Sequence, residues 1–123
     1  MAKILIIEDA ADFRVAYREM LEGEGYEVIE AVNGIEGLER LKSETVDLII
    51  TDIMMPEKGG IETIIDIRKD YPDVKIIAIS GAVSPDSETL LRLTNQYKVS
   101  RVLGKPIRFK ELFETIDELL KSV

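Results

Sequence analysis

The chain alternates short, mostly apolar runs with segments in which apolar residues recur every three or four positions. The short runs are typical of buried strands, and the recurring pattern is typical of amphipathic helices. We expect five strands, at Lys3–Ile7, Tyr26–Ala31, Val46–Thr51, Val74–Ile79 and Arg101–Leu103. The second run also contains Glu27 and Glu30, which favours a place nearer an edge of the sheet.

A helix is expected after each strand, with one apolar face. The residues of these five faces are Phe13, Ala16, Tyr17, Met20 and Leu21; Ile35, Leu38 and Leu41; Ile61, Ile64 and Ile65; Leu90, Leu93, Thr94 and Tyr97; and Phe109, Leu112, Phe113, Ile116, Leu119 and Leu120. Asn33 and Glu36 have the spacing of a capping box. Ser84 and Pro85 predict the first residues of the fourth helix, and Gly23 predicts the end of the first.

Strands that are apolar on both faces are typical of a parallel sheet covered by helices on both sides. Right-handed crossovers then give an α/β fold, a doubly wound (βα)5 sandwich of three layers. The 123 residues suit one domain, and no repeat or linker interrupts the pattern. We therefore expect a single domain over residues 1–123.

Composition narrows the chemistry. A net charge of −8 argues against binding to the nucleic-acid backbone. The chain has no cysteine and no histidine, which excludes thiol catalysis, Ser-His-Asp catalysis and histidine metal sites. A bound metal would be a hard cation held by oxygen. No segment is long enough for membrane insertion or a signal peptide, so we expect a cytoplasmic protein.

Polar residues stand where the predicted strands end. Glu8 and Asp9 follow the first strand, Asp52 follows the third, Ser80 the fourth and Lys105 the short fifth. The carboxyl ends of parallel strands meet at one edge, where ligands bind, so we expect these side chains to share a pocket. Three carboxylates, a hydroxyl and an ammonium group suit a divalent cation and a phosphoryl group.

Taken singly, each residue has a plainer explanation. Acidic residues are favoured where a helix begins, Asp52 fits a turn, and most lysines lie on the surface. Their common place at one sheet edge favours the pocket. Gly81 would let a ligand approach the backbone. Pro106 is a candidate cis-proline, although only about 5–6% of X–Pro bonds are cis, and a cis bond would turn Lys105 inward.

In order and spacing, these residues resemble the response-regulator receiver domain of two-component signalling, a phosphorelay system that includes chemotaxis regulators. The resemblance covers essentially the whole chain and rests on Glu8-Asp9, Asp52 with Pro56 and Gly60 after it, Ser80-Gly81-Ala82 and Lys105-Pro106. It implies a flavodoxin-like fold with strand order 2-1-3-4-5.

The resemblance also implies a phosphoacceptor and a metal site. Asp52 would become the aspartyl phosphate, and Asp9 and Asp52 would bind Mg²⁺, or alternatively Mn²⁺. The backbone carbonyl of Met54 would be a third ligand, and Glu8 would act through a metal-bound water.

The phosphoryl group would contact Lys105, Ser80 and Gly81. Ser80 and position 102 would form the switch that alters the surface of the fourth helix, fifth strand and fifth helix. The family usually has Tyr or Phe where this chain has Val102. We therefore do not expect an aromatic side chain to swing during activation.

The partners follow from the same resemblance. Since the chain has no histidine, the donor would be a sensor histidine kinase or a histidine phosphotransfer protein. The chain would catalyse its own phosphorylation as a signalling switch, not as a free-standing enzyme, and would contact a downstream protein. Self-association as a homodimer through the surface of the fourth helix, fifth strand and fifth helix is common in the family. Apolar Met54 and Ala82 predict slow self-dephosphorylation.

Three alternative functions compete with this interpretation. A haloacid-dehalogenase-type phosphatase needs a second acid where Met54 stands. A flavin- or nucleotide-binding protein needs a phosphate cradle where Glu8, Asp9 and Asp12 would repel phosphate. The stronger alternative is a receiver-like interaction module that works without phosphorylation, and Val102 keeps it open.

Overall fold

The computed structural model describes residues 2–53, 60–81 and 87–121. These residues form a parallel sheet in the order β2-β1-β3-β4-β5. The strands are β1 (Lys3–Ile7), β2 (Glu27–Ala31), β3 (Leu48–Asp52), β4 (Lys75–Ser80) and β5 (Arg101–Gly104). The helices are α1 (Ala11–Gly23), α2 (Gly34–Ser43), α3 (Gly60–Asp70), α4 (Glu88–Asn95) and α5 (Phe109–Lys121). The predicted α/β fold and strand order are confirmed.

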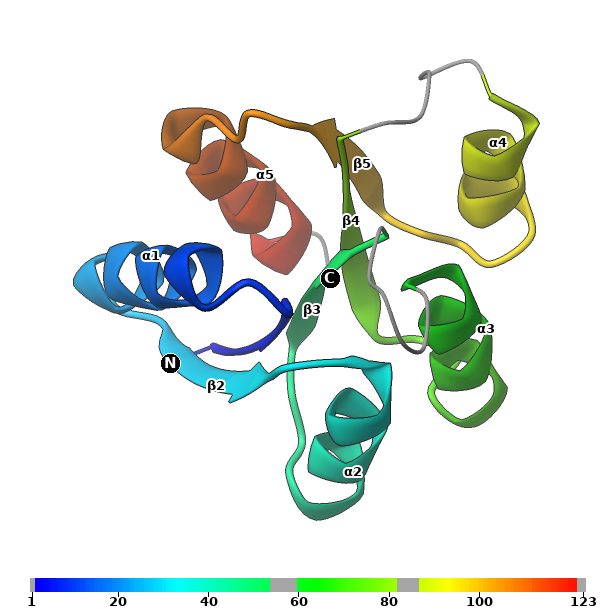
Figure 1. Cartoon of the computed structure of the whole chain (residues 1–123), viewed down its shortest axis with the longest axis horizontal. Coiled ribbons are helices and arrows are strands. Elements are labelled where there is room, and N and C mark those ends of the chain that lie inside the picture. The colour runs from blue at the N-terminus through cyan, green and yellow to red at the C-terminus, as the bar shows by residue number, and fades with distance from the viewer. Residues whose placement is uncertain (1, 54–59, 82–86, 122–123) are drawn as a thin grey trace.

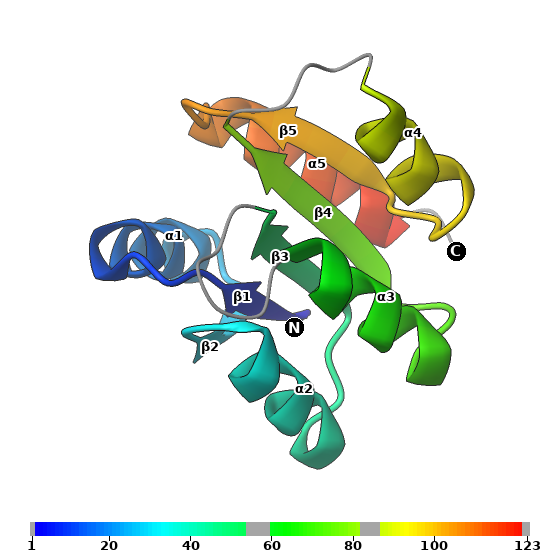
Figure 2. The same cartoon turned by 45° about the vertical axis from the view of Figure 1, so that its right-hand side comes forward.

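Helices cover both faces of the sheet. Figure 1 shows α1 and α5 on one side and α2, α3 and α4 on the other, and Figure 2 gives the same division from a second direction. Successive strand residues point to opposite faces, so the core forms two clusters. The α1–α5 cluster includes Ile4, Ile6, Leu48, Ile50, Tyr17, Leu21, Leu112 and Ile116. The other includes Leu5, Ile7, Ile49, Leu41, Ile64, Ile67, Leu90 and Leu93.

Two predicted helix starts had different outcomes. The cap predicted for α2 is confirmed, since the Asn33 side chain accepts from the Glu36 amide at 2.8 Å, and the Glu36 carboxylate accepts from the amide of Val32, one residue before the cap, at 3.2 Å. The start predicted for α4, at Ser84 and Pro85, lies outside the described residues. The helix begins at Glu88 because the Ser87 hydroxyl accepts from the Leu90 amide at 3.2 Å and caps it.

Some expected core positions lie on the surface instead. Phe13, Met20 and Ile35 are 53%, 42% and 53% exposed, and Thr94 is also exposed. The sheet covers a narrower strip of each helix than the apolar pattern suggests. On α1 that strip is centred on Tyr17 and Leu21.

One arginine fastens α3 to the segment after α4. Arg68 donates to the carbonyls of Tyr71, Tyr97 and Lys98 at 3.0, 2.7 and 3.0 Å. Burial lowers the pKa of Arg68, and the charge of Asp73 opposes that change. None of the helices within the described ranges is both long and apolar enough to cross a membrane.

Candidate functional site

The ends of β3, β4 and β5 bring three of the predicted residues together. In the parallel register, Asp52 pairs with Ile79 and Ser80 pairs with Gly104. The Lys105 amide then donates to the Ser80 carbonyl at 3.1 Å, which extends the ladder by one residue. Asp52, Ser80 and Lys105 are thus held at one edge by backbone hydrogen bonds.

Asp52 and Lys105 form an ion pair at this edge. Lys105 Nζ donates to Asp52 Oδ2 at 2.5 Å, while the Asp52 side chain is 3% exposed and that of Lys105 is 30% exposed. Partial burial acts to lower the pKa of Lys105, but its hydrogen bond to Asp52 and the charges of Asp52, Glu8 and Asp9 raise it overall. The lysine is therefore held in its charged form beside a buried carboxylate.

The Lys105–Pro106 peptide bond is cis. Gly81 lies against the stem of the same lysine, since a Cβ at position 81 would lie 3.1 Å from Lys105 Cδ. A glycine at this position therefore leaves room for the lysine side chain.

Glu8 is buried with one oxygen unused. Its Oε2 accepts from the Ala10 amide at 3.2 Å, whereas Oε1 has no hydrogen-bond partner in the described part of the chain. Burial raises the pKa of Glu8 to about 7, with a smaller contribution in the same direction from a hydrogen bond with Asp9 and the charge of Asp52. The Ala10 amide and the charge of Lys105 act in the opposite direction.

Ser80 is the second residue with a buried, unused polar atom. Its Oγ is buried and finds no partner among residues 2–53, 60–81 and 87–121. A buried polar atom without a partner costs roughly 1–3 kcal/mol. A ligand that supplies partners to Glu8 and Ser80 would recover part of that free energy.

The acidic residues suit a hard cation in chemistry and number. Asp9 is exposed, while Glu8 and Asp52 are buried. Within the described residues, no three carboxylates converge closely enough to form a metal site alone. Mg²⁺ commonly keeps several waters and needs only one or two carboxylates, so the acidic residues and the unused Glu8 oxygen fit such an ion. Met54 lies outside the described residues.

Gly60, the first residue of α3, packs directly on the backbone of Asp52. A Cβ at position 60 would lie 2.2 Å from the Asp52 carbonyl oxygen and 2.5 Å from Ile53 Cα. The Gly60 amide donates to the Ile53 carbonyl at 3.1 Å. The end of β3 and the start of α3 are therefore in direct backbone contact.

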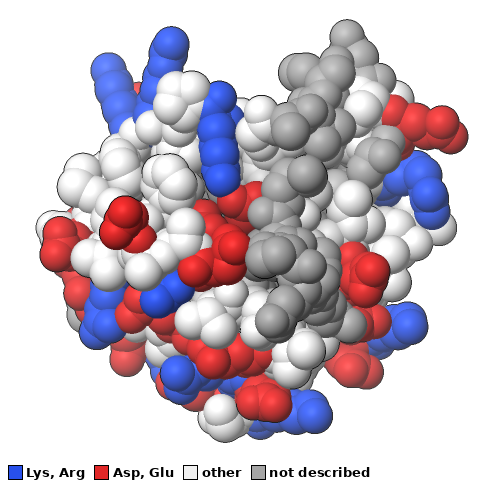
Figure 3. Space-filling model, viewed as in Figure 1, with Lys and Arg blue, Asp and Glu red and all other residues white. Residues whose placement is uncertain are grey.

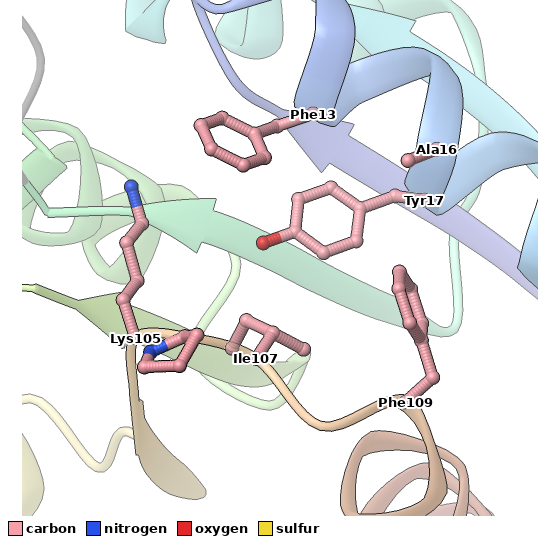
Figure 4. A pocket seen from close by; sticks show the side chains of 7 residues that line it. Phe13, Ala16, Tyr17, Lys105, Ile107 and Phe109 are labelled. Atoms are coloured by element: carbon pink, nitrogen blue, oxygen red, sulfur yellow. The ribbon is translucent and has the colours of Figure 1, made fainter.

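An apolar hollow of about 570 Å³ opens beside Lys105. It lies between α1 and the segment that leads into α5, and is lined by Phe13, Ala16, Tyr17, Lys105, Pro106, Ile107 and Phe109 (Figure 4). Lys105 Nζ lies 5.3 Å from the centroid of the Phe13 ring, a cation–π distance. The sequence placed Phe13 in the core, and its position at this site was missed.

The hollow also contains an aromatic pair. The rings of Tyr17 and Phe109 meet edge to face, with 6.0 Å between centroids. Burial raises the pKa of Tyr17 to about 12, and the negative charges of Glu8 and Asp52 add to the effect. The pKa of the Tyr17 phenol therefore depends on the charge of the neighbouring acidic site.

Charge is unevenly distributed on the face of the molecule that Figure 3 shows. Acidic side chains gather near its centre, with basic side chains above them, and the surface to the upper left is largely uncharged. Val102 pairs with Ala78 of β4 and packs, partly buried, against the core cluster that contains Leu90 and Leu93 of α4.

Comparison with known proteins identifies the family. Residues 4–117 match the response regulator receiver domain. The chain belongs to this family. It is 36% identical to the response regulator receiver protein CpdR of Brucella abortus, over 98% of both chains. It is also 32% identical to part of the sensor kinase CckA of the same organism, over 98% of this chain and 13% of CckA.

A solved receiver structure agrees with this assignment. The response regulator TrrA of Thermotoga maritima, solved in complex with Mg²⁺-BeF, is 34% identical and has a TM-score of 0.83, with 97% of this chain and 99% of TrrA covered. The resemblance seen in the sequence is therefore confirmed, as is the flavodoxin-like fold. Receiver domains are modules of two-component signalling and not classical enzymes.

Proposed function

We propose that this chain is a switch that accepts a phosphoryl group on Asp52 from a phosphohistidine of another protein. The observation that carries the proposal is the ion pair between buried Asp52 and Lys105. A carboxylate fixed in this way is a nucleophile with a cation already beside it. Within the described part of the chain, its neighbours Glu8 and Ser80 each have a buried side-chain oxygen without a hydrogen-bond partner.

The transfer follows from this arrangement. A carboxylate oxygen of Asp52 attacks phosphorus in line, so that an O–P bond forms while the P–N bond to the donor imidazole breaks. The electron pair of that bond stays on the imidazole nitrogen, which takes up a proton. The Lys105 ammonium then neutralises charge on the phosphoryl oxygens.

The acidic residues would hold a magnesium ion during this step. Asp9, Asp52 and the backbone carbonyl of Met54 would bind Mg²⁺ directly, and Glu8 would bind it through water. Mn²⁺ accepts the same oxygen ligands. The ion supplies charge neutralisation at the phosphoryl oxygens. The Mg²⁺-BeF complex of the related TrrA supports this part of the proposal.

The phosphorylated state would differ from the resting state at Ser80. The acyl phosphate adds negative charge next to the unused Ser80 hydroxyl, which can donate to it, beside Gly81. The segment after β4 and helix α4 would then shift, and the α4–β5–α5 surface would change its affinity for a downstream protein. Aliphatic packing of Val102 against the core cluster under α2, α3 and α4 would transmit the change in place of an aromatic side chain.

The donor is expected to approach over the apolar hollow. Exposed Phe13 borders Lys105 there, so a sensor histidine kinase or histidine phosphotransfer protein would cover it while presenting its phosphohistidine. The similarity to part of CckA supports a kinase pathway.

We further propose that residues 1–123 act as one cytoplasmic receiver domain whose output is protein contact, including self-association, and not nucleic-acid binding.

The test is phosphorylation by a small donor. Acetyl phosphate with Mg²⁺ should add one phosphoryl group to the wild type, measured by intact mass, and a chelator should prevent it. Asp52→Asn should form no adduct, whereas Asp70→Asn, at the exposed end of α3, should behave as wild type. An unmodified wild type, or an equal adduct on Asp52→Asn, would contradict the proposal.

A second candidate is an interaction module that works without phosphorylation, which the departure at Val102 favours. The affinity of a bound protein partner for the phosphorylated and the unphosphorylated chain distinguishes this candidate from the phosphorylation switch. Equal affinity for the Asp52-phosphorylated and unphosphorylated forms would support this second candidate. Slow loss of the phosphoryl group remains a prediction, because Met54 and Ala82 lie outside the described residues.

A further inference from the structure

Arg14 of α1 reaches the backbone of the acidic turn after β1. Its Nη1 donates to the Glu8 carbonyl at 2.9 Å and lies 3.5 Å from the Asp9 carbonyl. The Glu8 amide, on the other side of the same residue, donates to the Ala31 carbonyl of β2 at 3.0 Å. The backbone of Glu8 is thus held from both sides before its side chain enters the site.

Glu30 of β2 holds the arginine in turn. Glu30 Oε1 lies 3.3 Å from Arg14 Nε, and Glu30 Oε2 lies 2.5 Å from Arg18 Nη1. The Arg14 and Glu30 side chains are only 18% and 23% exposed. A planar guanidinium can bridge a carboxylate and a carbonyl at once, and a partly buried pair is less screened than a surface pair.

We propose that Arg14 and Glu30 are positioning residues for the cation site, which fix the turn that presents Glu8 and Asp9. This inference rests on the proposed function, because it assumes that those carboxylates receive Mg²⁺. The arginine acts through carbonyl oxygens and Glu30, so its role is to hold the backbone in place. Without the arginine, binding of Mg²⁺ would itself have to order the turn, and the affinity for Mg²⁺ would fall.

The chain offers a matched control on the same helix face. Arg18 pairs with Glu22 at 3.3 Å, in an exposed i,i+4 ion pair that does not involve Arg14. Glu22→Gln therefore removes one carboxylate from the same arginine-rich region and leaves the Arg14–Glu30 pair intact. Arg14→Met keeps the length of the side chain without its donors, and Glu30→Gln keeps the shape of the carboxylate without its charge.

The experiment is calorimetric titration of Mg²⁺ into the full metal-free chain and these variants. Arg14→Met and Glu30→Gln should each raise the Kd for Mg²⁺ about tenfold, in line with the effect of removing partners that orient metal ligands. Arg14→Lys should weaken Mg²⁺ binding less, because an ammonium group keeps the positive charge but lacks the several fixed donors of a planar guanidinium. Glu22→Gln should stay within about twofold of wild type.

A second measurement separates positioning from general damage. With acetyl phosphate and saturating Mg²⁺, the phosphorylation rates of Arg14→Met and Glu30→Gln should return to within about twofold of wild type. Unchanged Kd values, an equal change in Glu22→Gln, or rates that excess Mg²⁺ does not restore would each overturn the inference. If circular dichroism shows Arg14→Met unfolded, Arg14→Lys and Glu30→Gln decide together, because Glu30→Gln also removes the Arg18–Glu30 pair.

The two proposals can fail separately. A wild type that binds Mg²⁺ and forms the adduct, with variants that bind equally well, overturns only the positioning role. A wild type that binds Mg²⁺ without forming an adduct overturns the phosphoacceptor function, and the Kd values still decide the positioning role. A wild type that does neither overturns both.

Discussion

The two faces of the sheet are closed to different degrees beside the site. On the α2–α3–α4 face, Leu90 and Leu93 are 5% and 1% exposed, and Arg68 fastens α3 to the end of the α4 segment. On the α1–α5 face, a hollow of about 570 Å³ remains open, with Phe13 53% exposed at its border. The first face is packed for stability, and the second leaves surface and charge available to a partner.

This difference separates two kinds of substitution. Truncation on the closed face should reduce the free energy of unfolding and leave the Asp52 chemistry intact in the folded fraction. Substitution on the open face should alter phosphorylation, donor contact or pH dependence with smaller effects on folding.

The largest expected effect is on the closed face. Leu93→Ala removes a buried side chain from α4 and should lower the free energy of unfolding by about 2–5 kcal/mol. Leu91→Ala, on the same helix but 52% exposed, should change it by less than about 0.5 kcal/mol. Urea denaturation measures both. Equal effects would mean that α4 does not pack on the sheet as described.

Lys105→Ala should have the largest effect on chemistry. It removes the cation paired with Asp52, and the rate of phosphorylation by acetyl phosphate should fall about 100-fold. The control is Lys110→Ala, an exposed lysine in the first turn of α5. Intact-mass time courses measure the phosphorylation rates, and the rate of Lys110→Ala should equal that of the wild type. A similar rate for both variants would exclude a role for the Asp52–Lys105 pair.

Glu8 should make the stability of the metal-free protein depend on pH. Its pKa is raised in the folded state from 4.5 to about 7, so the folded chain binds more protons than the unfolded chain between those values. The contribution of Glu8 to stability is therefore full below pH 4.5 and lost as pH rises towards 7 and beyond.

Glu8→Gln lacks this dependence. Relative to wild type, the variant should gain roughly 2 kcal/mol between pH 5 and pH 8. Urea denaturation with a chelator present measures this difference, and Mg²⁺ should reduce it by stabilising the carboxylate. A difference that does not vary with pH would show that Glu8 is not buried as a proton-binding group.

Phe13→Ala tests the open face with the smallest expected effect. Transfer from a phosphohistidine protein that phosphorylates the wild type should slow about fivefold at limiting donor, because truncating a contact residue commonly costs about 1 kcal/mol. Phosphorylation by acetyl phosphate should change much less. Ile35→Ala, equally exposed on α2, is the control. Equal transfer rates for Phe13→Ala and wild type would place donor contact elsewhere.

Much of the fold could be predicted because its signals are local. The continuous run Lys3–Ile7 becomes β1 with the predicted ends, and Asp52, Ser80 and Lys105 lie at strand ends as their apolar predecessors indicated. The ends of elements shift where local signals compete. The third strand begins at Leu48 rather than Val46, because Asp47 uses its backbone amide and its side chain to bond to Lys3.

The parts that could not be predicted depend on contacts between distant segments. Periodicity identified Phe13 as apolar but could not show that α5 leaves it uncovered. Arg14 and Glu30 are ordinary charged residues in the sequence, and only the packing of α1 beside β2 brings them together. The cap of α4 was also missed, because a serine before a helix pattern is a common signal and only the structure shows that Ser87 accepts from the Leu90 amide.

The contact of Gly60 with β3 limits which sequences this fold tolerates. In a saturation library, position 60 should return only glycine, since any Cβ would overlap backbone atoms of Asp52 and Ile53 that cannot move aside. Gly37 offers an informative contrast, because a Cβ there would meet the tip of the Ile7 side chain at 2.6 Å, and that tip can rotate. Alanine at position 37 should therefore survive selection for folding, while alanine at position 60 should not.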